Sequence, residues 1–114
     1  MAYTLTKRVN LFHVEKFGIA LDVYPDLGSV GLVIAETETG HNQEFRHTST
    51  FHYLILEGGG TFFLDDEEVS VEKGDMLSIP PHTRIYYKGR MKILLVTDPP
   101  WKEENEVETR AKIW

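Results

Sequence analysis

The side chains that could carry chemistry in this chain are five histidines and one run of four acidic residues, with no cysteine. Without cysteine there is no thiol chemistry and no disulfide. The acidic run Asp65-Asp66-Glu67-Glu68 separates two short runs of β-forming residues. Consecutive acids in that position are more typical of a solvated hairpin tip than of a metal cluster. The histidines therefore remain the main candidates, and their role depends on where the fold holds them.

The elements that must position these side chains are short strands. Runs rich in Val, Ile, Phe, Tyr and Thr recur with Gly, Pro and Asp between them. This pattern predicts an all-β sandwich or small barrel. The predicted strands are 17–24, 30–38, 43–48, 52–57, 61–64, 69–71, 76–79, 85–87 and 91–97, with one or two more within 3–14. The polar tail after residue 101 is expected to hold one short helix or to stay mobile.

The stretch from Phe51 to Gly60, FHYLILEGGG, organises the predicted sheet. A short run of Tyr, Leu and Ile closed by three glycines is typical of a strand buried on both faces and followed by a tight corner. Gly89, between Lys88 and Arg90, predicts a turn between the last two strands.

Composition and charge narrow the class of protein. A chain of 114 residues, 41% hydrophobic, predicts one domain with a single core. The net charge of −6 and the pI near 5.3 disfavour binding to nucleic acid or to an anionic membrane. The N-terminal residues lack the apolar run of a signal peptide, and no apolar run is long enough to span a bilayer. We therefore expect a soluble cytoplasmic protein with no nucleic-acid and no membrane partner.

The glycine corner and a second punctuated stretch resemble the cupin superfamily, in particular the small single-domain conserved-barrel cupins (cupin 2 type). The resemblance covers roughly residues 30–101 and is carried by LEGGG at 56–60, by Gly74-Asp75 followed by Ile79-Pro80-Pro81, and by Pro99-Pro100-Trp101. It implies a double-stranded β-helix, or jelly roll, with 1–114 as one domain. Within it, 1–29 would supply N-terminal strands, 30–101 the conserved barrel and 102–114 a C-terminal tail. Cupins of this kind are usually dimeric.

The same resemblance bears on metal binding. The positions at which cupins usually place their four metal ligands are Phe45, His47, Phe51 and Ile85 in this chain. Only His47 keeps a donor atom, whereas a catalytic divalent site typically has about three nitrogen or oxygen ligands from the protein. The sequence therefore predicts a degenerate metal motif and no cofactor. The alternative is one divalent ion such as Fe, Mn, Ni or Zn, held by His47 with non-standard ligands such as Glu44 or His82.

Strand alternation predicts which side chains line the barrel, because residues two apart on a strand share a face. The predicted lining is Phe45, His47, Phe51, Tyr53, Ile55, Ile85 and Tyr87, with Arg84 at the mouth. The other four histidines are expected to be ordinary surface, interface or partly packed residues: His13, His41, His52 and His82. The resulting cavity is apolar and aromatic, with few polar groups.

Three functions fit such a cavity. The first is a binding module for a small molecule, sugar-like or a carboxylate, that uses no metal. The second, implied by metal-independent cupins, is a sugar isomerase or epimerase with His47 as general base and Tyr53 or Tyr87 as acid. The third is a metal-dependent cupin enzyme, an isomerase or dioxygenase, with non-standard ligands. The first is favoured, and whether the protein is an enzyme is left open.

The outward face of the 52–57 strand predicts a partner subunit. His52, Leu54 and Leu56 point away from the cavity, and an exposed apolar stripe on a sheet needs a cover. Either the N-terminal strand or a second subunit supplies that cover, so we predict a homodimer to which N-terminal residues contribute. Trp101 and Trp114 are expected to fold over the barrel or to serve the dimer.

Overall fold

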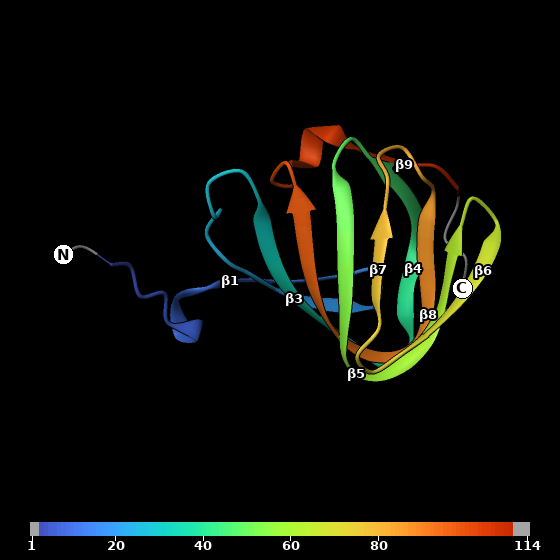
Figure 1. Ribbon diagram of the computed structural model, residues 1–114, viewed down its shortest axis with the longest axis horizontal. Coiled ribbons are helices and arrows are strands. Elements are labelled where there is room, and N and C mark those ends of the chain that lie inside the picture. Colours follow the sequence, from blue (N-terminus) through green and yellow to red (C-terminus); the bar gives the residue numbers. More distant parts are fainter. Residues whose placement is uncertain (1–2, 111–114) are drawn as a thin grey trace.

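The computed structural model describes residues 3–110, and these form an all-β fold with two short 3-10 turns (Figure 1). The strands are β1 (Phe12–Lys16), β2 (Ile19–Val23), β3 (Gly31–Thr37), β4 (Gly40–His47), β5 (Thr50–Leu64), β6 (Glu67–Glu72), β7 (Met76–Ile79), β8 (Ile85–Asp98) and β9 (Glu106–Glu108). The turns are η1 (Arg8–Asn10) and η2 (Glu103–Asn105). The predicted all-β class is confirmed. No helix within the described residues could cross a membrane.

Two long strands, β5 and β8, are the spine of the sheet. They pair antiparallel over nearly their whole length, from Thr50 opposite Asp98 to Leu64 opposite Ile85. The other edge of β8 pairs with β3 and then β4, and the other edge of β5 pairs with β7 and then β6. Because both long strands bend midway, the sheet curls into the barrel seen in Figure 1. The jelly-roll architecture predicted from the sequence is confirmed.

The bend in β5 and β8 lies at their glycines. The predicted corner after Gly58 and the predicted turn at Gly89 are both wrong, because β5 and β8 run continuously through these positions. The two backbones approach so closely that a Cβ on Gly60 would lie 2.1 Å from the Lys88 carbonyl oxygen. A Cβ on Gly89 would lie 2.6 Å from the Gly59 carbonyl oxygen, and Gly89 also has a φ of 127°. The glycines therefore do not end β5 and β8. They allow the two paired strands to approach closely.

Side chains selected by strand alternation are buried in the barrel interior. All seven predicted lining residues are at most 4% exposed: Phe45, His47, Phe51, Tyr53, Ile55, Ile85 and Tyr87. Phe62 and Ile93 complete the same core and are fully buried. The Tyr53 ring centroid lies 4.9 Å from that of Phe62, within the range of favourable aromatic contact. Burial of this apolar set is the main source of stability for a domain of this size.

The N-terminal residues lie outside the barrel. β1 pairs with β2, and β2 pairs with β3. The segment before β1, blue in Figure 1, extends away from the sheet and leaves Leu5 and Val9 72% and 87% exposed. Leu54 and Leu56, on the outer face of β5, are only partly buried. The outer face of β5 therefore keeps apolar surface in contact with solvent.

After β8 the chain returns across one end of the barrel. β9 pairs antiparallel with β4, with Phe45 opposite Glu108 and His47 opposite Glu106. We call residues 99–110 the C-terminal strap. The tail was expected to hold one short helix or to stay mobile. It contains the short 3-10 turn η2, and it also contains a strand, β9, which its polar composition does not predict. Trp114 lies outside the described residues.

Candidate functional site

His47 is buried at the strap end of the barrel, and both of its ring nitrogens are engaged. The Ser49 backbone N–H donates to Nδ1 at 2.9 Å, so Nε2 carries the proton. Nε2 in turn lies 2.9 Å from the Lys102 carbonyl oxygen and donates to it. The ring also stacks on Trp101, with a centroid distance of 6.1 Å. His47 therefore ties the strap to β4, and its role as a base or metal ligand stays a prediction.

His41, at the start of β4, corrects a prediction. We expected a surface or interface residue, but His41 is 5% exposed. Its ring packs among Phe17, Phe45 and Tyr87, with centroid distances of 5.4, 4.8 and 5.7 Å. The expectation was wrong because it rested on the distance of His41 from His47, whereas the two residues share a face of β4 and both are buried. His41 thus belongs to the interior aromatic cluster.

The His41 ring has one unpaired nitrogen in an apolar setting. Its Nδ1 is buried and has no hydrogen-bond partner within residues 3–110. Burial lowers the pKa of His41 from 6.5 to about 4, and the positive charge of Lys16 acts in the same direction. At neutral pH the ring is uncharged, so a nitrogen lone pair is available. A buried group without its hydrogen bond is costly, which makes this atom a candidate contact for a ligand.

Two buried tyrosines belong to the same cluster: Tyr87 contacts the His41 ring, and Tyr53 contacts Tyr87. Tyr53 and Tyr87 are each 2% exposed, and their rings meet edge-on with centroids 5.9 Å apart. Burial raises the pKa of both hydroxyls, and for Tyr53 the nearby charges of Tyr87 and Glu106 add to the rise. Both hydroxyls therefore stay protonated at neutral pH and are available as hydrogen-bond donors.

Three further residues from distant parts of the chain meet where the strap crosses the barrel. The Lys16 Nζ lies 4.8 Å from the Trp101 ring centroid, a cation–π distance. It also lies 3.9 Å from Glu106 Oε2. The Trp101 indole N–H donates to Glu106 Oε1 at 3.0 Å. Sequence reasoning missed Lys16 and Glu106, because only the β4–β9 pairing brings the strap to this end of the barrel.

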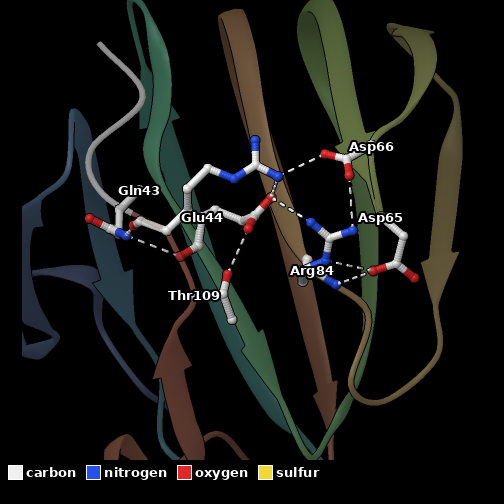
Figure 2. A network of polar contacts seen from close by, with 7 residues as sticks. Gln43, Glu44, Asp65, Asp66, Arg84 and Thr109 are labelled. Atoms are coloured by element: carbon white, nitrogen blue, oxygen red, sulfur yellow. Dashed lines mark hydrogen bonds and ion pairs between the residues drawn. The ribbon is translucent and has the colours of Figure 1, made fainter.

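Arg84 lies in a polar network on the neighbouring side of the barrel (Figure 2). Its guanidinium donates to Asp66 at 3.0 Å and pairs with Asp65 at 3.4 Å and with Glu44 at 3.6 Å. Asp65 and Asp66 have positive φ at the β5–β6 connection, as expected for a hairpin tip. The Arg84 guanidinium is therefore already paired with three carboxylates of the chain. Its contact with a ligand stays a prediction.

The remaining histidines lie away from the barrel interior. His52 Nδ1 is 2.7 Å from the Ser78 hydroxyl on the outer face, and His82 is exposed in the β7–β8 connection. His13 pairs with Asp22 at 2.8 Å. Among residues 3–110, no group of three or more His, Cys, Asp or Glu side chains is arranged to hold a metal ion. Three of the four usual ligand positions carry Phe45, Phe51 and Ile85, so the donor set does not fit the family's metal.

Comparison with known proteins places this geometry in a family. No family profile matches the chain. An uncharacterised protein of Methanocaldococcus jannaschii is 43% identical over 63 residues, which are 52% of this chain, and the match spans half the length of that relative. A variant of Streptomyces Pac13 solved with uridine is 32% identical, with a TM-score of 0.91 over 96% of this chain and 93% of that one.

Two further solved structures are similar to this chain, one in sequence and fold and one in fold alone. Pac13, described as a β-barrel nucleoside dehydratase, is 34% identical, with a TM-score of 0.89 over 96% of this chain and 92% of that one. KdgF from Halomonas sp. has a TM-score of 0.74 at 13% identity, over 90% of this chain and 98% of that one, so it shares the fold alone. The fold and the aromatic interior define a cupin of the kind that binds or processes a small molecule. The chain belongs to the cupin superfamily, in the family that includes Pac13.

Proposed function

We propose that this cupin binds a nucleoside, or a sugar derivative of similar shape, in the barrel beside His41, Tyr53 and Tyr87. The walls are aromatic rings, which suit the faces of a planar base or a sugar. Among them, the His41 Nδ1 lacks a partner within the described chain and can fix the orientation of a ligand. The likeness to Pac13, solved with uridine, supports this ligand class.

A detail of the Pac13 structures supports the choice of residues. Variants solved with uridine replace one histidine by glutamine, or one of two tyrosines by phenylalanine. Those two tyrosines lie 34 positions apart in Pac13, and Tyr53 and Tyr87 have the same separation here. In our proposal His41, rather than His47, is the histidine at the ligand, because the Nδ1 of His41 is free and both nitrogens of His47 are bonded.

We propose as the reaction a metal-independent elimination of water from such a ligand. The observation that carries it is the unpaired, uncharged Nδ1 of His41. This nitrogen takes a proton from a carbon next to the one that bears a hydroxyl. The electrons of the broken C–H bond form a double bond as the hydroxyl leaves, and the imidazolium returns the proton to it, so that water is released. No oxidant or reductant is needed.

In this scheme the two phenols act as hydrogen-bond donors. Their raised pKa values make full proton loss unfavourable, so neither serves as a base. A donor fixed in a site with little water stabilises an oxygen on which negative charge develops. We assign this task to Tyr87, which touches the His41 ring at 5.7 Å, and a binding role to Tyr53.

The test begins with binding and then turns to chemistry. Calorimetric titration with uridine, the other nucleosides, simple sugars and small carboxylates should give saturable heat for a nucleoside. Nuclear magnetic resonance then follows loss of a carbon-bound proton and formation of an alkene in nucleosides that carry an acidic C–H beside a hydroxyl. His41→Gln should bind the same ligand without turnover. Turnover that survives this substitution would remove His41 from the mechanism.

Metal independence has its own measurement. Protein purified without chelator should contain less than about a tenth of an equivalent of any divalent metal, because the usual ligand positions carry apolar residues. One equivalent of iron, manganese, nickel or zinc, lost in His47→Ala, would establish the metal-dependent alternative instead.

A pure binding module is the second candidate, favoured by the same aromatic walls. It predicts nucleoside affinity with no product over days of incubation. It also predicts that His41→Gln weakens binding, because the unpaired nitrogen then serves only as a hydrogen-bond acceptor.

We also propose a homodimer. The half-buried Leu54 and Leu56 form an apolar outer face, and the exposed Leu5 and Val9 extend from the barrel as a free apolar segment. Light scattering after size-exclusion chromatography should give twice the mass of 13.1 kDa at micromolar concentration. A monomer would contradict the proposal.

A further inference from the structure

The C-terminal strap is tied to the barrel at both ends. Near its start, the Ser49 hydroxyl donates to the Pro99 carbonyl at 2.8 Å, and His47 bonds to the Lys102 carbonyl. Near its end, the Thr109 N–H donates to the Glu44 carbonyl at 3.1 Å. Between these ties the strap carries the indole and the carboxylate that lie beside Lys16. The position of both groups therefore depends on how firmly the strap is held.

The strongest tie at the far end is the side chain of Glu44. Glu44 is 1% exposed, and a buried carboxylate is costly unless cations and donors surround it. The Thr109 hydroxyl donates to its Oε1 at 2.8 Å, and the Arg110 Nη2 lies 3.1 Å from its Oε2 (Figure 2). Arg84 is the third partner, at 3.6 Å. Two of the three partners of this buried charge thus belong to the strap.

Arg110 extends the tie to a second part of the barrel. Its Nη2 also donates to Asp66 at 2.8 Å, at the tip of the β5–β6 hairpin. The Gln43 side-chain amide donates to the carbonyl of Arg110 and, at 3.1 Å, to that of Glu44. The end of the strap is therefore fixed on β4 and on the hairpin at once. Only four residues, about 13 Å of extended chain, separate Arg110 from Glu106, so fixing Arg110 limits the movement of Glu106.

We propose that Glu44 and Arg110 form a latch that holds the strap and so positions Trp101 and Glu106 at the barrel mouth. Both latch residues are positioning residues and touch no ligand themselves. Release of the latch would let the strap move as a unit hinged near Pro99 and open the interior beside Lys16. The effect on a bound nucleoside rests on the function proposed above, whereas the effect on Trp101 does not.

The latch is tested by the environment of Trp101. The sequence has two tryptophans, so Trp114→Phe leaves Trp101 as the single fluorophore. In that background, Arg110→Ala should at least about double the acrylamide quenching constant of Trp101, because local release exposes more of a side chain that is 36% exposed when the strap is held. Glu44→Gln, which keeps the shape and can still accept from Thr109, should act in the same direction, and Arg110→Lys should restore much of the protection.

Arg90→Ala is the matched control. Arg90 forms an exposed ion pair with Glu38 at 3.1 Å, away from the strap. It should leave Trp101 quenching unchanged. Circular dichroism and the thermal midpoint of each variant confirm that the barrel is folded. Unchanged quenching in folded Arg110→Ala and Glu44→Gln overturns the latch.

Uridine binding by stopped-flow fluorescence separates the latch from the proposed function. If the parent protein binds uridine, Arg110→Ala should raise the dissociation rate about fivefold or more, since a loosened strap closes poorly over the ligand. Equal dissociation rates in the two proteins would overturn the positioning role. If the parent binds no nucleoside, the proposed function fails, and the quenching comparison still decides the latch.

Discussion

The two ends of β4 hold two buried histidines of opposite character. His47 is 3% exposed, and both of its nitrogens are bonded to backbone groups. His41 is 5% exposed, and its Nδ1 has no partner within the described residues. Burial alone therefore does not distinguish the two rings. Their hydrogen bonds do, and the unpaired Nδ1 is the basis for proposing His41 as the ligand contact.

Replacing the unpaired histidine should have the largest effect on chemistry. We expect His41→Gln to lower kcat by about 10²- to 10⁴-fold, the usual contribution of a general base. Its folding stability should change little, because no hydrogen bond of Nδ1 is lost. The measurement is single-turnover kinetics with the substrate found in the nucleoside screen. Equal losses of rate in His41→Gln and His47→Gln would remove the contrast between the two ends of β4.

Replacing the bonded histidine should act on stability instead. His47→Ala leaves the Ser49 N–H and the Lys102 carbonyl unpaired and removes a ring packed on Phe51 at 5.5 Å. We expect a loss of about 4 kcal/mol in the free energy of unfolding, from the cavity and the two unpaired groups together. Urea denaturation measures it, and His41→Ala is the comparison. A loss below about 1 kcal/mol would show that the bonds of His47 are not structural.

The pH dependence of stability sharpens the contrast further. The pKa of His41 is about 4 in the folded chain against 6.5 when unfolded. Between these values the unfolded chain binds a proton that the native ring refuses, so stability falls as pH falls from 6.5 to 4. At about 1.36 kcal/mol per pH unit, the loss is about 3 kcal/mol by pH 4.

Urea denaturation across this pH window provides the measurement. Carboxylates also titrate there, so the relevant quantity is the difference in slope between the parent and His41→Gln. The parent should be the more pH-sensitive of the two. Identical slopes would mean that the buried ring takes up its proton with an ordinary pKa.

The smallest expected effect belongs to the phenol that touches His41. Tyr87→Phe removes one donor and keeps the ring, which packs against Phe62 at 4.6 Å. We expect about a tenfold loss in kcat/KM, equivalent to about 1.4 kcal/mol, with stability nearly unchanged. Tyr86→Phe, on the outward side of the same strand, is the control. A larger loss of kcat/KM in Tyr86→Phe than in Tyr87→Phe would contradict a site on the inward face of β8.

The sequence predicted those features of the barrel that depend on one strand alone, and missed those that depend on a neighbouring strand. Alternation along strands identified the interior positions of β5 and β8, because side-chain direction there follows the pleat. It also put His41 on the face of His47, but the six positions between them led us to expect His41 at the surface. Gly89 was interpreted as a turn. Glycine also permits two paired strands to approach closely, and a turn can be told from such an approach only when the position of the partner strand is known.

The mouth of the barrel was beyond sequence reasoning for another reason. Lys16 and Glu106 are 90 positions apart, and their proximity requires β9 to return to β4. Nothing local in the polar strap indicates that pairing. Arg84 was expected at the mouth of the barrel, but the sequence did not predict its ion pairs with Glu44 on β4 and with Asp65 and Asp66 at the hairpin tip.

The position of β8 in the sheet also governs the order in which the barrel can assemble. This strand pairs with β3, β4 and β5, and it lies near the end of the described chain. The β1–β2, β2–β3, β5–β6 and β5–β7 ladders join strands that precede residue 85, but the ladders that join β3, β4 and β5 to β8 wait for residues 85–98 to arrive. Contacts of such long sequence separation typically slow folding to about milliseconds or seconds. Until β8 arrives, the edges of β3, β4 and β5 are open, so collapse of the aromatic interior should coincide with the slowest folding step.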